Sequence, residues 1–254
     1  AGSVEYAGES DRIFPVLLRH NILWEVYIMY SEAENQEINT KNSIDDFGCL
    51  KNAFDFDSDI QYLTIIGSIE GHNVLASDVK TTKYENMIPQ LIAVQENPKI
   101  RGLLIVLNTV GGDVEAGLAL AELISSISKP TVSLVLGGGH SIGIPLATSA
   151  DYSFIAPSAA MTLHPVRTTG LVIGAEQTYE YFRRMQERIT DFIVKTSGAQ
   201  RDVIAELMSA KNDMANDVGT ILYGKEAVEA GLIDSVGGLY DALNKLRELT
   251  EKEM

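Results

Sequence analysis

Cysteine is almost absent from this sequence of 254 residues, because Cys49 is the only one. A single cysteine cannot form an internal disulfide, and without a Cys/His cluster it cannot build a zinc ribbon. We therefore expect no metal, and no pattern of residues indicates an organic cofactor. A chain without disulfides is typical of the cytoplasm, where we expect this protein to be found.

Basic residues are also few, with 20 Lys and Arg against 35 Asp and Glu, so that the formal net charge is −15. A surface of this charge repels polyanions, which makes nucleic acid a poor partner. Basic polypeptide segments would be attracted instead.

Long apolar runs are missing as well. A membrane-spanning helix needs about 20 mostly apolar residues, and the best candidate, residues 13–29, is interrupted by Arg19, His20 and Glu25. The same stretch lacks the basic start and the small-residue cleavage site of a secretory signal. We expect no transmembrane segment.

The composition that remains, 45% hydrophobic and 22% charged residues, is that of a globular protein. Residues 1–60 differ from the rest, because an apolar and aromatic stretch is followed by an acidic one over residues 31–59. We predict an N-terminal arm of uncertain structure over residues 1–60 and one domain over residues 61–254. The arm is either a solvated segment packed on the domain or a docking segment.

From residue 62 onward, buried strands alternate with amphipathic helices. This alternation predicts an α/β fold with right-handed crossovers and a mostly parallel sheet. We predict strands over residues 62–69, 102–107, 131–136, 152–156, 160–163 and 232–236, and helices over 82–97, 114–128, 176–196, 200–210 and 224–230, with two more starting at about 141 and 240.

Two glycine-rich loops join a buried strand to a helix. In NTVGGDV, residues 108–114, the paired glycines leave backbone N–H groups exposed beside a helix N-terminus, although such a glycine pair more often serves the turn alone. The loop does not match a nucleotide-binding P-loop. In GGGHSIG, residues 137–143, Ser141 stands where a nucleophile would have the following N–H as an oxyanion donor, or where a serine simply caps the helix.

A nucleophilic serine needs a base, and the chain has four histidines. His140 is adjacent to Ser141, and neighbouring side chains diverge, so it is a poor base. His20 lies in the arm and His72 at a turn. His164 ends a short strand that one turn can return to the serine, so it is the candidate base, unless it is only a packed strand-end histidine.

Four motifs in this order resemble the Clp proteolytic-subunit family of serine peptidases, and within it most resemble the branch of translocation-enhancing proteins. They are NTVGGDVEAGLALAE, GGGHSIG, MTLHP and GKEAVEAGLIDSVGG. The resemblance runs over residues 62–246, and residues 1–60 are not covered. It implies a ClpP/crotonase-type spiral of β-α units with a protruding long helix.

The resemblance also implies an activity, which is cleavage of unfolded or small polypeptides through an acyl-enzyme. It makes Ser141 the nucleophile and His164 the general base, and it gives the oxyanion hole to the N–H groups of Gly111, Gly112 and Ile142. It further implies a homo-oligomer, a heptameric ring or a stacked double ring. It leaves open whether an ATPase feeds the chamber.

The third member of the triad departs from the family pattern. The family has an aspartate just before the motif that is ILYGKEAV here, and the matching residue is Gly219, or Thr220 with a shift. Asp217 is the nearest acid and Asp213 lies further back. The site is therefore either a triad with Asp217 or a Ser–His dyad.

Three other functions compete with this one. A Ser–Lys dyad needs a lysine near Ser141, but no lysine occurs between Lys129 and Lys195. We therefore do not expect a Ser–Lys mechanism. A crotonase-like acyl-CoA enzyme would use two backbone N–H donors and give His164 no clear role. A non-catalytic ring scaffold would keep the fold with a degenerate triad.

Overall fold

The computed structural model describes residues 58–167, 173–211 and 218–252. These residues belong to one compact unit, whose first residue is Asp57. The arm predicted over residues 1–60 lies outside the described residues, apart from its last three.

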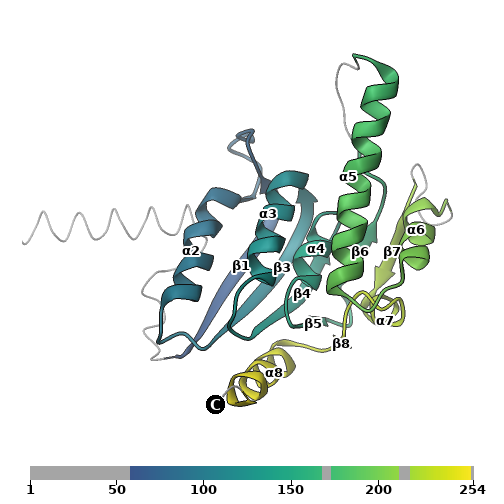
Figure 1. Ribbon diagram of the computed structural model, residues 1–254. Coiled ribbons are helices and arrows are strands. Elements are labelled where there is room, and N and C mark those ends of the chain that lie inside the picture. The colour runs from purple at the N-terminus through teal and green to yellow at the C-terminus, as the bar shows by residue number, and fades with distance from the viewer. Residues whose placement is uncertain (1–57, 168–172, 212–217, 253–254) are drawn as a thin grey trace, which may run out of the picture. The chain divides into compact units, whose positions relative to one another are not determined.

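Strands and helices alternate along most of the chain (Figure 1). The strands are β1 Ile60–Glu70, β2 Thr81–Lys83, β3 Gly102–Gly112, β4 Thr131–Gly139, β5 Tyr152–Ile155, β6 Ala160–Leu163, β7 Thr220–Tyr223 and β8 Ser235–Val236. The helices are α2 Tyr84–Glu96, α3 Val114–Ser125, α4 Gly143–Thr148, α5 Ala175–Thr196, α6 Arg201–Ser209, α7 Gly224–Glu229 and α8 Leu239–Lys252.

The sheet is mostly parallel, as the sequence predicts. Its main part has the order β2-β1-β3-β4-β5-β8, and every neighbouring pair in it is parallel. A second, smaller part branches off β4, where Gly138 pairs with Ala160 of β6, and β6 then pairs with β7 in antiparallel fashion. The sequence therefore predicts the fold class correctly but misses β2 and β7.

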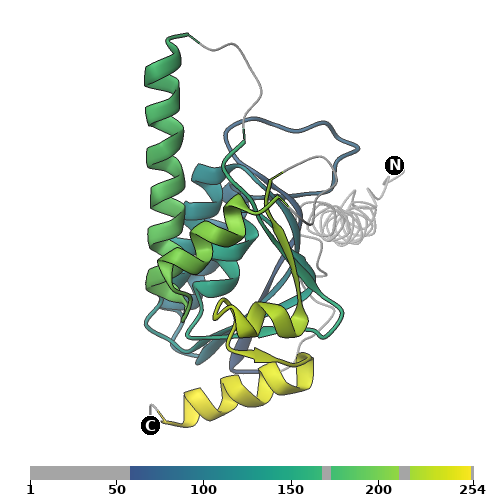
Figure 2. The ribbon, with the colours of Figure 1, turned by 90° about the vertical axis from the view of Figure 1, so that its right-hand side faces the viewer.

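Both faces of the central strands are covered, which explains their unbroken apolar runs. In β3, Leu103, Ile105 and Leu107 belong to the large core cluster, to which α2, α3, α4 and α5 contribute. Leu104, which alternates with them, belongs to a second cluster that includes residues of α8. Figures 1 and 2 show α8 lying at the end of the sheet away from the tip of α5.

Helix α5 is buried along only part of its length. Met185, Ile189, Phe192 and Ile193 are buried in the core, as the predicted apolar stripe requires. Tyr179, in the first half of the helix, is 71% exposed, and this half extends past the ends of α3 and α4 (Figures 1 and 2). The protruding long helix expected from the resemblance is confirmed.

Candidate active site

The site begins where β4 leaves its regular pairing with β3. Leu107 pairs with Val135, but Thr109 already pairs with Gly139, so β4 bulges between them. The side chain of Asn108 holds the bulge, because its Oδ1 accepts a hydrogen bond of 3.0 Å from the N–H of Gly138. The three consecutive glycines therefore make room for a bulge that turns the chain toward β6.

Ser141 follows this bulge in a strained backbone conformation. Its φ is +58°, and among the described residues no other non-glycine residue has a positive φ. A left-handed conformation is costly for a residue with a Cβ, and such strain is typical of functional turns. Helix α4 begins only at Gly143, with Ile142 as its N-cap residue, so the interpretation of Ser141 as a simple N-cap is wrong.

Strand β6 holds the turn from the other side. The N–H of Ser141 donates to the carbonyl oxygen of Thr162 at 2.9 Å, and Nδ1 of His140 lies 2.8 Å from Oγ1 of Thr162. Burial, and then the nearby His164, lower the pKa of His140 below its ordinary value. A neutral His140 tied to Thr162 supports the turn next to Ser141, and the prediction that His140 is not the base stays a prediction.

Ser141 and His164 line one cavity of about 200 Å³. His164 comes directly after β6 and is half-buried. Its Nδ1 lies 2.7 Å from the carbonyl oxygen of Pro165. The return of the chain through β5 and β6 therefore places this histidine at the same cavity as the serine, and its role as the base stays a prediction.

The rest of the cavity is mainly apolar. Its lining side chains come from the start of α3, from α4, β6, α5 and α6, and they include Val114, Ile144, Leu163, Val166, Ile189, Ile193 and Met208. Gln186 and Arg167 add polar groups. Among the described residues that line the cavity, none is Asp or Glu.

The three predicted oxyanion donors differ in their surroundings. Gly112 and Ile142 line the cavity with Ser141, and within the described chain the N–H of Ile142 has no hydrogen-bond partner. The N–H of Gly111 donates to Oγ1 of Thr109 at 3.1 Å. Gly111 instead permits a close approach: a Cβ at this residue would lie 2.8 Å from the Cβ of Ser141.

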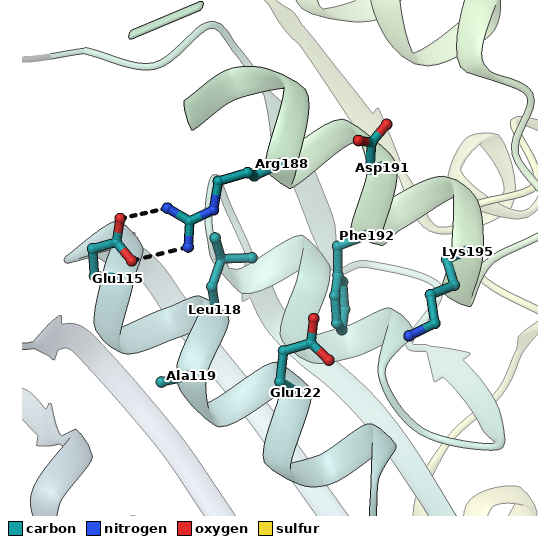
Figure 3. A pocket seen from close by; sticks show the side chains of 8 residues that line it. All are labelled: Glu115, Leu118, Ala119, Glu122, Arg188, Asp191, Phe192 and Lys195. Atoms are coloured by element: carbon teal, nitrogen blue, oxygen red, sulfur yellow. Dashed lines mark hydrogen bonds and ion pairs between the residues drawn. The ribbon is translucent and has the colours of Figure 1, made fainter. Parts of the chain in front are cut away.

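The remaining candidates lie elsewhere. His72 stacks on the ring of Tyr84, and His20 and Asp217 are outside the described residues. Lys195 lines a different cavity of about 390 Å³ between α3 and α5. Figure 3 shows its side chain in the part of this cavity where Glu122 lies. A Ser–Lys dyad with Lys195 is therefore not supported.

Gly219, which matches the family aspartate, lies against the candidate base. Leu163 pairs with Thr220 across β6 and β7, so the residues just beyond this pair, His164 and Gly219, face each other. A Cβ at Gly219 would lie 2.9 Å from the Cβ of His164. The residue that matches the family aspartate in sequence therefore lies beside His164, but a glycine supplies no side chain there.

Neither a metal site nor a membrane-spanning helix is found in the part of the chain that the structure describes. There, no group of three or more His, Cys, Asp and Glu side chains could hold a metal ion. No helix in the same residues is both long and apolar enough to cross a membrane.

The fold and this site define a ClpP-type α/β protein, and comparison with known proteins agrees. The Clp protease family model matches residues 61–239. The chain belongs to the Clp protease family.

Individual relatives agree with this assignment. Over 196 residues the chain is 58% identical to the translocation-enhancing protein TepA of Halalkalibacterium halodurans, covering 77% of each chain. It is 29% identical over 140 residues to the ATP-dependent Clp protease proteolytic subunit 1 of Chlamydia muridarum, with coverage of 53% of this chain and 69% of the relative. The Streptococcus uberis proteolytic subunit is 25% identical over 173 residues, or 64% of this chain and 82% of the relative. The resemblance to the translocation-enhancing branch is confirmed.

Sequence reasoning did not find two residues that hold the site. Thr162 bonds both Ser141 and His140, and it stands in the quoted motif MTLHP, but a threonine in a strand carries no functional signature. Pro165 acts through its carbonyl oxygen, and a main-chain contact leaves no trace in residue type.

Proposed function

We propose that the protein is a serine peptidase that uses Ser141 as nucleophile and His164 as general base. The observation that carries the proposal is a serine in a left-handed turn that lines one cavity with a histidine. A sharp turn of this kind exposes a hydroxyl and aims the following N–H groups at the same space. Membership of the Clp protease family supports the same chemistry.

In the proposed reaction, Oγ of Ser141 attacks the scissile carbonyl carbon while its proton passes to Nε2 of His164. The oxyanion that forms is stabilised by backbone N–H groups, each worth about 3–4 kcal/mol of barrier. We assign this task to the N–H groups of Ile142 and Gly112, because both residues line the cavity. Gly111 has a different role, since its lack of a side chain allows Ser141 to lie close to it. His164 then gives its proton to the leaving amine, and water hydrolyses the acyl-enzyme by the same steps.

The substrate is a polypeptide with an apolar residue at the cleaved bond. This follows from the apolar side chains of the cavity, which would be buried against an apolar substrate group. A lysine or arginine at that position would meet no carboxylate among the described lining residues and would lie near Arg167. The preference for basic polypeptides, predicted from the net charge, therefore applies to approach from a distance.

The assembly belongs to this proposal too. Tyr179 and Tyr181, in the protruding half of α5, are 71% and 55% exposed, and aromatic side chains are enriched in protein interfaces. We assign this half of α5 to contacts between copies of the chain in a heptameric ring or a stacked double ring. The predicted cytoplasmic location stays a prediction.

Labelling by a fluorophosphonate probe tests the proposed function directly. The probe should modify Ser141, and Ser141→Ala should abolish both labelling and peptide cleavage. His164→Ala should slow labelling by about 10³-fold or more. Ser125→Ala is the matched control, because Ser125 is exposed at the end of α3 and its loss should change neither rate.

The alternatives predict different results. Equal labelling of the wild type and of Ser141→Ala would overturn the proposal. Binding of acyl-CoA without labelling would instead support the crotonase-like enzyme. A folded oligomer that neither reacts with the probe nor binds acyl-CoA would support the non-catalytic scaffold.

A further inference from the structure

The far nitrogen of His164 already has a partner in the main chain. Its Nδ1 lies 2.7 Å from the carbonyl oxygen of Pro165. A carbonyl oxygen can only accept, so this hydrogen bond exists only when Nδ1 carries the proton. In the neutral ring Nε2 is then unprotonated, which is the form that a general base needs. The contact with Pro165 therefore selects the tautomer that an aspartate selects in a Ser-His-Asp triad.

The segment that provides this carbonyl is stiff. The proline ring fixes φ of Pro165, and a residue before proline is restricted to extended conformations. The backbone dihedrals that join the two residues, ψ of His164 and φ of Pro165, are therefore restricted. Because the hydrogen bond is local, it needs no long-range contact to form.

The place of the family aspartate is closed. Gly219 is buried with φ of +139°, and a Cβ there would lie 2.3 Å from the carbonyl oxygen of Leu163. The backbone at this residue is also held, since the N–H of Gly219 donates to the carbonyl oxygen of Ala210 at 2.8 Å. A side chain at residue 219 would therefore have to displace backbone.

We propose that the main-chain carbonyl of Pro165 takes the role of the third triad member, so that Ser141 and His164 work as a dyad to which no carboxylate contributes. This inference rests on the proposed function and deepens it. Pro165 is a positioning residue, since it acts only through His164. During attack the proton of Ser141 moves to Nε2, while the Nδ1 proton stays on the ring and remains bonded to Pro165.

The chemistry of a carbonyl has a consequence for the rate. A carboxylate carries a full negative charge and stabilises the imidazolium that forms during attack, whereas a neutral carbonyl does so less well. The dyad should therefore turn over more slowly than a triad, but its rate should not depend on a nearby acid.

The test replaces the two nearest acids in the full chain. We expect Asp217→Asn, Asp213→Asn and the double variant to react with a fluorophosphonate within about threefold of the wild-type rate. Loss of an orienting aspartate costs about 10⁴-fold in a triad, so a loss of about 10³-fold or more in any of these folded variants would overturn the proposal. The thermal midpoint of each variant shows whether it is folded.

A second measurement reports the tautomer without relying on activity. Solid-state NMR of the full chain labelled with ¹⁵N-histidine should show His164 with a protonated Nδ1 and an unprotonated Nε2, and His164→Gln identifies its signals. The same tautomer should persist in Asp217→Asn. A neutral ring protonated at Nε2, in the wild type or in that variant, would overturn the proposal.

The two experiments separate this inference from the proposed function. If the wild type does not react with the probe but shows the expected tautomer, the peptidase function is rejected. The role of Pro165 in orienting His164 is then still supported. A reactive wild type that loses its rate in Asp217→Asn would reject the dyad but leave the peptidase.

Discussion

Gly111 lies near the end of β3 and Ser141 in the turn after β4, and the two residues approach each other closely. A Cβ at Gly111 would lie 2.8 Å from the Cβ of Ser141 and 2.9 Å from the carbonyl oxygen of His140. The φ of Gly111 is +90°, where a residue with a Cβ is strained. Both the conformation and the contact therefore require glycine, which explains one of the two glycines in the first loop.

Gly111→Ala should therefore damage both stability and activity. The strained φ alone costs about 1–2 kcal/mol, and the contact pushes Ser141 away from the cavity. We expect a lower thermal midpoint and a fluorophosphonate labelling rate reduced by about 10²-fold, since small misplacements of reacting groups are expensive.

Gly238→Ala is the matched control for this substitution. A Cβ at Gly238 meets nothing within 4 Å, so the change in the free energy of unfolding should stay within about 0.5 kcal/mol. If Gly111→Ala were as stable and as reactive as this control, the contact with Ser141 would have no role in the site.

At this scale the sequence predicts the residue types of the site but not their conformations. Ser141 and His164 could be found because a nucleophile and a base are recognisable by chemistry, and because the strands between them imply a return of the chain. The left-handed φ of Ser141 could not, since it follows from the bulge in β4 that the contact of Asn108 with Gly138 holds. The carbonyl of Pro165 could not either, because every residue has one.

Among the elements, the sequence predicts the long strands and also the short strands β5, β6 and β8, but it misses β2 and β7. Strand β2 has three residues, and two of them fall within the helix predicted over residues 82–97. Strand β7 has four residues and directly precedes α7. Strand β3 was predicted to end at residue 107 but continues to Gly112, because pairing with β1 extends through Gly111 and Gly112. Glycines read as a loop can thus be strand when a neighbouring strand supplies the hydrogen bonds.

A bidentate ion pair joins helix α5 to α3 at the edge of the cavity of about 390 Å³. Two guanidinium nitrogens of Arg188 lie 2.7 and 3.1 Å from the two carboxylate oxygens of Glu115 (Figure 3). The hydrogen bonds from Arg188 lower the pKa of Glu115 despite its partial burial. Both side chains are about half exposed, so the pair should contribute to the free energy of unfolding only as much as a surface ion pair does.

A double-mutant cycle of Glu115→Gln and Arg188→Met measures this contact between elements. We expect a coupling free energy of about 0.2–1 kcal/mol at pH 7 from urea unfolding. Because the pKa of Glu115 is lower in the folded protein, the coupling is fully present above the ordinary carboxyl pKa of about 4.3 and is lost as the pH falls through the lowered pKa of the folded protein.

The pair Lys225 and Glu229 on α7 is the matched control for this cycle. It lies within one helix, with 84% and 61% of the side chains exposed, and should give the smaller coupling. A coupling between Glu115 and Arg188 that is zero at pH 7, or that does not change in acid, would show that the ion pair does not join α3 and α5.

At the scale of the whole molecule, the net charge of the chain is strongly negative, whereas the described lining of the cavity is mainly apolar. The chain carries a net charge of −15, yet the described lining residues of the cavity include Arg167 and no Asp or Glu. The long-range field should therefore gather basic polypeptides, while the cavity itself should accept an apolar side chain. A basic residue in the substrate therefore has two effects, attraction from a distance and a poor fit inside the cavity. Placing the basic residue far from the cleaved bond or at it separates the two effects.

Peptides with one apolar residue at the cleaved bond and either lysines or glutamates several residues away test the long-range effect. We expect the lysine peptide to be cleaved with a kcat/KM about tenfold higher at low ionic strength, because opposite charge raises the rate of association. The difference should shrink above about 0.1 M salt, where charges further apart than about 10 Å are screened. A third peptide with lysine at the cleaved bond itself should be cleaved more slowly than the apolar one at every salt concentration. Equal rates for the first two peptides, independent of salt, would show that the acidic surface does not face the path to the site.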